Sequence, residues 1–293
     1  MLTVPEAFDK FKSRLEISAS EQTDASRRQQ TIRDQVRAGF AVDRDFLTGS
    51  YARHTKTKPL KDVDIFVVLK DSEADYLDKA PDVVLDRLIE ILSPHYPGKT
   101  SKGNRSVKVD FGVSGTIDEQ VASFDVVPAF EDGDAYTIPD RRQGGWIKTN
   151  PRIHAEKATG ANEAFAKQWK PVVKMAKKWN DHHDKPVKPS FLLEVMALKL
   201  LAAPWGGSYP RELRQFFASA AASLDEVWPD PAGLGPAVST RLAEDPWQRQ
   251  QAQQALREAE AACTEALRLE QSGRTGGALD AWQDLFGPRF AKS

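Results

Sequence analysis

Two aspartates at the start of one apolar segment carry the clearest chemical signal in the chain. Asp62 and Asp64 open the run "DVDIFVVL", and residues two apart on a β-strand point to the same face of a sheet. Carboxylates held that close repel each other and are costly to remove from water unless a cation lies between them. Oxygen ligands at this density favour Mg²⁺. The alternative is a pair of exposed acids at the solvated start of a strand.

A third aspartate strengthens the first interpretation. Asp125 lies in "SFDVVPAF", and a carboxylate among apolar residues is costly unless it is paired or bound to a metal. If its strand lies beside that of Asp62 and Asp64, the three carboxylates resemble a two-metal centre for phosphoryl transfer. One ion would lower the pKa of an attacking hydroxyl, and the other would hold the triphosphate and the leaving pyrophosphate. Asp110 in "VKVDFG" competes for the third place, but we favour Asp125 because the strand of Asp110 carries a lysine and is predicted to be less buried.

Gly49 and Ser50 form a second feature, and Ser50 precedes Asp62 by twelve residues. Glycine lets the backbone approach a phosphate without a Cβ in between. The serine hydroxyl and the neighbouring N–H groups can hold phosphate oxygens, and the loop "ARHTKTK" that follows is basic. A Gly-Ser pair alone is consistent with any polar loop. Ahead of an Asp-x-Asp strand and a later buried aspartate, it predicts a triphosphate site.

The elements that position these residues follow from apolar periodicity and turn residues. Strands are predicted before the Gly-Ser turn, at 63–69, and on either side of a turn at 113–119. Helices are predicted at 5–40, 80–96, 154–180, 190–203, 210–227 and 238–272. The fold class is therefore α+β, with a mixed sheet and two lobes. Residues 1–150 are expected to form an α+β lobe with a long N-terminal brace helix, and residues 151–293 a helical lobe.

Composition narrows the class of protein and its location. The chain has 293 residues and a net charge of -1, so no overall basic field indicates nucleic-acid binding. Its single cysteine excludes an internal disulfide and fits a reducing compartment. The N-terminus has no apolar core of a signal peptide, and no apolar run is long enough for a membrane helix. We therefore expect a cytoplasmic protein without a membrane partner.

The motif "GSYARHTKTKPLKDVDIFVVL" together with "FDVVPAF" resembles the GS…DxD…D pattern of the polymerase-β-type nucleotidyltransferase superfamily. Within it, the chain is most similar to the CD-NTases, the cGAS/DncV-like enzymes of the SMODS group. The later segments "WIKTNPRIH", "VVKMAKKWN", "KPSFLLEVMALKL" and "ALDAWQDLFGPRF" resemble the helical lobe of that family. The resemblance therefore covers nearly the whole chain, although the later segments are weaker signals than the acids.

The resemblance implies that residues 1–150 are a catalytic lobe with a polymerase-β-like core, and that the helical lobe of residues 151–293 closes over its nucleotide cleft. It implies an enzyme that makes a cyclic di- or trinucleotide second messenger from NTPs, with release of pyrophosphate, in antiphage defence. It implies two Mg²⁺ ions, with Mn²⁺ as a substitute, held by Asp62, Asp64 and Asp125. Asp125 would also help to activate the ribose hydroxyl, and Gly49 and Ser50 would contact the donor triphosphate. The implied partners are NTP substrates and an effector reached through the product, with no stable nucleic-acid partner.

Two further phosphate contacts are implied by the resemblance alone. Lys177 would neutralise triphosphate charge, although it is also one of four lysines on a predicted helix. Ser190 would add a second contact, although it is equally suited to be the N-cap of the helix that follows.

Other functions share parts of this pattern. A template-independent RNA nucleotidyltransferase, such as a CCA-adding enzyme or a poly(A) polymerase, carries the same motif but needs a basic RNA-binding tract, which the charge balance disfavours. A catalytically inactive nucleotide sensor is disfavoured because all three acids are present. A minimal antitoxin-type nucleotidyltransferase is disfavoured because such chains lack a large helical lobe.

Overall fold

The computed structural model describes residues 2–112 and 121–290, and the chain divides into two compact units. Ile17–Ala155 form the unit that holds the sheet, and the segments on either side of it, Met1–Glu16 and Glu156–Ser293, form a helical unit. The predicted α+β class is confirmed. The N-terminal segment expected in the catalytic lobe is divided between the two units, because residues up to Glu16 group with the C-terminal helices.

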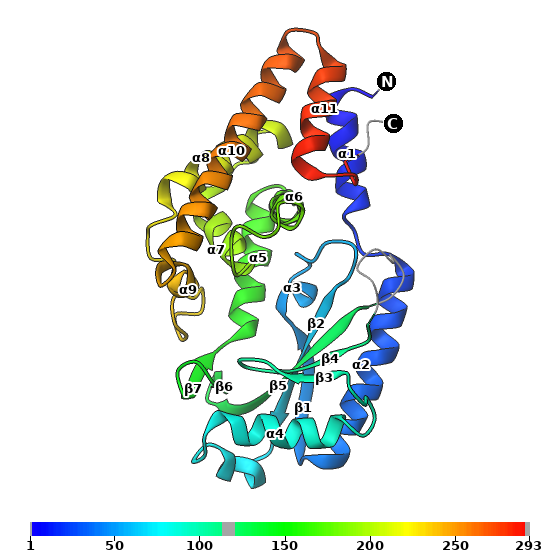
Figure 1. The fold of residues 1–293 in the computed structure, drawn as a ribbon, viewed down its shortest axis with the longest axis vertical. Coiled ribbons are helices and arrows are strands. Elements are labelled where there is room, and N and C mark those ends of the chain that lie inside the picture. Colours follow the sequence, from blue (N-terminus) through cyan, green and yellow to red (C-terminus); the bar gives the residue numbers. More distant parts are fainter. Residues whose placement is uncertain (1, 113–120, 291–293) are drawn as a thin grey trace. The chain divides into compact units, whose positions relative to one another are not determined.

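The strands of the described residues form one mixed sheet of seven strands (Figure 1). They are β1 (Val42–Thr48), β2 (Asp62–Leu69), β3 (Thr100–Lys102), β4 (Val107–Asp110), β5 (Ser123–Asp132), β6 (Ala135–Asp140) and β7 (Gly145–Thr149). Their order is β1-β2-β5-β4-β3, and the β6–β7 hairpin pairs with the end of β5. β2 and β5 run parallel, whereas β1–β2 and β4–β5 are antiparallel. The turn predicted at 113–119 lies outside the described residues.

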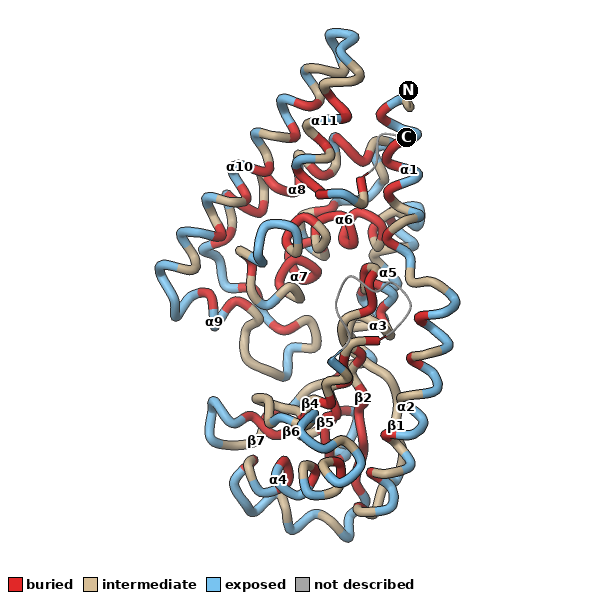
Figure 2. The backbone as a smooth tube through the Cα atoms, turned by 45° about the vertical axis from the view of Figure 1, so that its right-hand side comes forward, coloured by how far each residue is buried: buried red, intermediate tan, exposed pale blue. Residues whose placement is uncertain are grey.

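The two faces of β2 differ, and this difference places the aspartates. Val63, Ile65 and Val67 pack into a core with α2 (Ala19–Gly39) and α4 (Pro81–Leu92). Phe66 belongs to a separate cluster on the opposite face. Since strand residues alternate between faces, Asp62 and Asp64 lie on the face away from the helices. Figure 2 colours most of β2 as buried, because apolar clusters lie on both faces of the strand.

Short helical segments connect the strands of this unit. α3 (Gly49–Ala52) follows β1 directly, and a 3₁₀ helix at Asp71–Tyr76 follows β2. The predicted Gly-Ser turn is thus the start of a single helical turn. Its short loop leads back into β2, so the Gly-Ser pair and the first two aspartates lie at the same end of the sheet.

The helical unit is all helix and loop within its described residues. Its helices are α1 (Val4–Arg14), α5 (Pro151–Ala164, which begins in the other unit), α6 (Trp169–His182), α7 (Phe191–Leu200), α8 (Tyr209–Ser223), α9 (Thr240–Ala243), α10 (Pro246–Gln271) and α11 (Thr275–Phe286). Figure 1 shows α1 beside α11. Phe8 joins them, with ring centroids 5.0 Å from Trp282 and 5.1 Å from Phe290. In the part of the chain that the structure describes, no helix is long and apolar enough to cross a membrane.

The single helix predicted at 5–40 is wrong, because the chain forms two helices there. α1 ends at Arg14, and α2 begins at Ala19 after the N-cap Ser18. Ser18 accepts a hydrogen bond from the Glu21 N–H while the Glu21 side chain accepts one from the Ser18 backbone. This capping box fixes a helix start where a continuous helix was expected.

Two other long helices were also predicted as single elements and are each divided in two. Between α5 and α6, Ala166 and Lys167 adopt φ values of 50° and 62°, a left-handed conformation that ends a right-handed helix. Between α9 and α10, Asp245 caps the second helix by accepting a hydrogen bond from the Gln248 N–H, and Pro246 occupies its first turn.

Candidate active site

The register of β2 and β5 brings the three predicted carboxylates together. Asp64 is paired with Asp125 across the two parallel strands, and Asp62 is paired with Ser123. Side chains paired in this way point to the same face, and Asp62 lies two residues from Asp64 on that face. The structure therefore makes one group of acids from two strands that are distant in sequence.

Their surroundings neutralise these acids only in part. Asp64 keeps some exposed surface, but protein groups crowd its carboxylate. This loss of water, together with the charges of Asp62 and Asp125, raises the pKa of Asp64 to about 6 against the opposing effect of Lys56 and Arg53. Burial likewise raises the pKa of Asp125. A cation placed among these carboxylates would relieve this unfavourable energy.

Two of the three carboxylates already accept hydrogen bonds from the protein. Lys56 Nζ lies 2.5 Å from Asp62 Oδ1, and Ser106 Oγ donates to Asp125 Oδ1 over 2.8 Å. Within residues 2–112 and 121–290 the three acids share one face of the sheet, but neither they nor any other three His, Cys, Asp or Glu side chains are close enough in this conformation to hold a metal ion. The donor set has the all-oxygen chemistry of a hard divalent cation, but a cation would have to compete with these hydrogen bonds.

Gly49 lies against Asp64. Its φ of +65° is in the left-handed region, and a Cβ at this position would overlap Asp64 Oδ2. The Ser50 carbonyl accepts hydrogen bonds from the N–H groups of Thr55 and Lys56, over 3.0 and 3.1 Å. These bonds fix the basic loop to the Gly-Ser turn. Glycine is therefore required both for the backbone angle and for the close approach to the carboxylate.

Asp110, the competing candidate for the third acid, is engaged elsewhere. Its carboxylate accepts a hydrogen bond from the Gly112 N–H over 2.8 Å and lies 3.3 Å from Lys108 Nζ. These contacts, the backbone hydrogen bond first, lower the pKa of Asp110. In the sheet it is paired with Ser123, whereas Asp125 is paired directly with Asp64. The geometry thus favours Asp125 as the third member.

Lys177 and Ser190 lie in the helical unit. Lys177 Nζ lies 2.8 Å from Glu194 Oε1, and the side chain of Glu194 is only 3% exposed. Ser190 stands at the N-cap position of α7, but its side chain makes no capping hydrogen bond. The structure therefore gives Lys177 a buried partner and does not use Ser190 as a cap.

Two acids on α2, neither of them predicted from the sequence, accept hydrogen bonds from the backbone just before β2 and just before β5. Glu21 Oε1 accepts a hydrogen bond from the Leu60 N–H over 2.7 Å, just before β2. Asp24 Oδ2 accepts one from the Val121 N–H over 2.9 Å, just before β5. Glu21 is fully buried, and its spacing after Ser18 signals the capping box but not its second bond, to Leu60. Nothing local in the sequence indicates the partner of Asp24.

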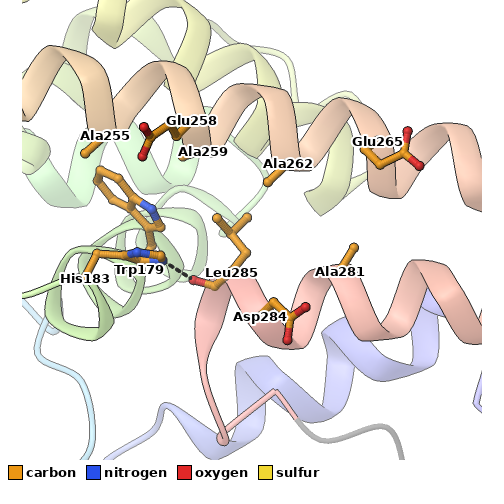
Figure 3. Close-up of a pocket in the computed structure, with 10 residues that line it drawn as sticks. All are labelled: Trp179, His183, Ala255, Glu258, Ala259, Ala262, Glu265, Ala281, Asp284 and Leu285. Carbon is orange, nitrogen blue, oxygen red and sulfur yellow. Dashed lines mark hydrogen bonds between the residues drawn. The ribbon is translucent and has the colours of Figure 1, made fainter.

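A cavity of about 380 Å³ lies among α6, α10 and α11 in the helical unit (Figure 3). Alanines form much of its lining, with Trp179 and with His183, whose Nε2 lies 3.0 Å from the Leu285 carbonyl. Its charged lining residues are Glu258, Glu265 and Asp284. Acids of this kind repel a triphosphate, and none of the predicted site residues lines the cavity, so we do not assign nucleotide binding to it.

Comparison with known proteins identifies the family to which the chain belongs. The sequence profile of the Second Messenger Oligonucleotide or Dinucleotide Synthetase domain (SMODS) matches residues 2–162. A probable cyclic nucleotide synthase of Bacillus cereus is 26% identical over 276 residues, which cover 83% of this chain and 80% of that protein. A cyclic AMP-AMP-AMP synthase of Acinetobacter is 28% identical over 214 residues, 68% of this chain and 59% of that protein.

The fold is likewise similar to solved structures. The CdnC protein of Escherichia coli, solved with ATP, superposes with a TM-score of 0.71, covering 98% of each chain at 21% sequence identity. At this identity the likeness concerns the fold. The arrangement of the sheet and the helices thus has a known counterpart.

Proposed function

The chain belongs to the Second Messenger Oligonucleotide or Dinucleotide Synthetase family, and from this membership we propose that it joins nucleoside triphosphates into a cyclic oligonucleotide and releases pyrophosphate. The observation that carries the proposal is the register of β2 and β5, which pairs Asp64 with Asp125 and leaves Asp62 on the same face. The names of the two relatives, both cyclic nucleotide synthases, support this class of product.

Asp62, Asp64 and Asp125 are proposed to hold two Mg²⁺ ions, for which Mn²⁺ would substitute. Enzymes of this family generally depend on a divalent metal. The all-oxygen donor set and the raised pKa of Asp64 support such a site. Bound there, the ions would stabilise charge on the α-phosphate and lower the pKa of the attacking ribose hydroxyl. The Asp125 carboxylate, beside Asp64, would orient that hydroxyl and help to remove its proton.

Gly49 and Ser50 are proposed to contact the donor triphosphate through their backbone N–H groups and the Ser50 hydroxyl, since the glycine lets this turn lie directly against the Asp64 carboxylate. Lys177 and Ser190 are proposed as further phosphate contacts, as in the family resemblance. ATP is proposed as one substrate. The cyclic AMP-AMP-AMP synthase relative and the CdnC structure solved with ATP support this choice.

Incubation with ATP and Mg²⁺ in the absence of RNA tests this function. We expect pyrophosphate and a product that resists phosphatase, identified by mass spectrometry. Asp125→Asn should abolish both, whereas the matched variant Asp110→Asn should retain activity, because Asp110 bonds to its own strand and the next loop. Strict dependence on RNA would contradict cyclisation and indicate a template-independent RNA nucleotidyltransferase.

We also propose that the product acts on a downstream effector in antiphage defence, as the family resemblance implies. The test is phage plating on the native host carrying either the wild-type gene or the Asp64→Asn variant. Lower plating efficiency on the wild-type strain is expected. Equal plating across a broad phage panel would contradict this role without affecting the assignment of the reaction.

A further inference from the structure

Lys56 is bonded to Asp62, one of the three carboxylates proposed to hold the metal ions. Its ammonium lies 2.5 Å from Asp62 Oδ1. The Lys56 side chain is only 12% exposed, whereas that of Asp62 is 44% exposed. Mg²⁺ binds oxygen ligands at about 2.0–2.1 Å in near-octahedral geometry. Lys56 and a metal ion therefore compete for the negative charge of this carboxylate.

The backbone of Lys56 is tied to the Gly-Ser turn. The N–H groups of Thr55 and Lys56 both donate to the Ser50 carbonyl, and Thr55 is fully buried. His54 adopts a φ of 57°, which turns the chain back toward Ser50. A lysine ammonium on a flexible stem can leave Asp62, but its anchored backbone keeps it within reach of whatever Gly49 and Ser50 bind.

We propose that Lys56 is an exchangeable counter-ion that couples metal binding to nucleotide binding, an inference that rests on the proposed function. Without ligand its ammonium neutralises Asp62. When a metal–nucleotide complex arrives, Asp62 passes to the metal, and the ammonium moves onto the triphosphate. Each charge then keeps a partner of opposite sign.

The exchange makes the two ligands cooperative. A metal ion alone must compete with Lys56 for Asp62 and places a second cation beside it. A nucleotide alone draws Lys56 away from Asp62 and so weakens the neutralisation of that carboxylate. The complex does neither, so each ligand raises the affinity of the other, and linkage requires the two factors to be equal.

Lys56→Met tests this, because it removes the charge and keeps the length of the stem. Calorimetric titration would measure Mn²⁺ affinity alone and in the presence of a non-hydrolysable ATP analogue. We expect Mn²⁺ alone to bind about two- to fivefold more tightly, as for loss of a partly exposed ion pair. The metal–analogue complex should bind about tenfold more weakly, as for loss of a charged hydrogen bond. The coupling factor, which is the Mn²⁺ affinity with the analogue divided by the Mn²⁺ affinity without it, should fall at least fivefold.

Two variants separate exchange from a simple change of charge. Lys108→Met removes a cation that also acts on Asp125 but is paired with Asp110. It should change Mn²⁺ affinity slightly and leave the coupling factor unchanged. Lys56→Arg should keep most of the coupling, because it keeps a cation on the same tether.

The outcomes can be distinguished from those of the proposed reaction. A coupling factor in Lys56→Met within twofold of wild type, or unchanged Mn²⁺ affinity, would overturn the exchange. Failure of wild-type protein to bind the analogue would overturn the proposed function, and with it the coupling. Normal binding and coupling without product would leave the exchange supported and the reaction refuted.

Discussion

Gly49→Ala is expected to damage the candidate site through two separate effects. The φ of +65° costs an L-residue about 1–2 kcal/mol relative to glycine. The new Cβ would also overlap Asp64 Oδ2 and lie 2.6 Å from Asp64 Cγ, and overpacking of this kind costs about 1–3 kcal/mol. The free energy of unfolding should therefore fall by about 2–5 kcal/mol. The side chain that must move is the central acid of the site.

Gly133→Ala is the matched control. Gly133 lies between β5 and β6 with a φ of +59°, but a Cβ there would meet no atom within 4 Å. This variant should show the backbone effect alone, about 1–2 kcal/mol. The difference between the two variants isolates the collision with Asp64.

Denaturant unfolding and pyrophosphate release from ATP and Mg²⁺, expressed per folded molecule, measure the two effects. A displacement of Asp64 by about 1 Å should lower the rate about a hundredfold in Gly49→Ala. Gly133→Ala should remain within about twofold of wild type, since a surface turn leaves the catalytic geometry in place. If the two variants lose stability and activity equally, the contact between Gly49 and Asp64 has no role in the site.

Three further predictions concern the acids and the helical unit. The raised pKa of Asp64 means that the folded, metal-free protein keeps a proton that the unfolded chain has lost, so this carboxylate makes stability fall as pH rises from about 4 to about 6. Asp64→Asn removes this pH dependence. In denaturant titrations, the free energy of unfolding of the variant should therefore exceed that of wild type by a margin that grows from about pH 4 to about pH 6. A margin that stays constant would contradict the raised pKa of Asp64. Lys177→Met should lower the free energy of unfolding by about 3–5 kcal/mol by removing the cation from Glu194, and adding Glu194→Met should restore stability but not activity; recovered activity would assign Lys177 to structure alone. Ser190→Ala should change stability by less than about 0.5 kcal/mol, because the side chain makes no cap, yet raise the KM for ATP several-fold, and an unchanged KM would exclude the phosphate contact.

Local patterns in the sequence were sufficient to predict the strands that carry the acids. The β-branched and aromatic run after Asp64 predicted its strand, and the two-residue spacing predicted that Asp62 and Asp64 share a face; the structure confirms β2 and β5. The pairing of Asp64 with Asp125 was only a conditional expectation, because the register of two parallel strands depends on packing between distant segments. The same holds for Asp24, whose hydrogen-bond partner is the Val121 N–H.

Other features were missed for different physical reasons. The break before α2 was encoded locally by Ser18 and Glu21, but the absence of Gly and Pro after Pro5 suggested one continuous helix. The contact of Lys56 with Asp62 depends on a loop conformation with a positive φ at a non-glycine residue, which composition does not reveal. The β6–β7 hairpin was missed because its strands are short and interrupted by a proline and by charged residues.

The aromatic contact between α1 and α11 has a consequence for the order of events during synthesis. Phe8 is made before the sheet unit, whereas Trp282 and Phe290 are made after it. At about 5–20 residues per second, a ribosome needs roughly 15–60 s to pass from one to the other. Residues 17–155 are contiguous, so we expect their sheet to fold on the nascent chain. Until α11 is made, the apolar face of α1 stays exposed. A ribosome that stalls before Trp282 would then leave a folded sheet unit beside an exposed apolar helix, a state that chaperones and proteases recognise.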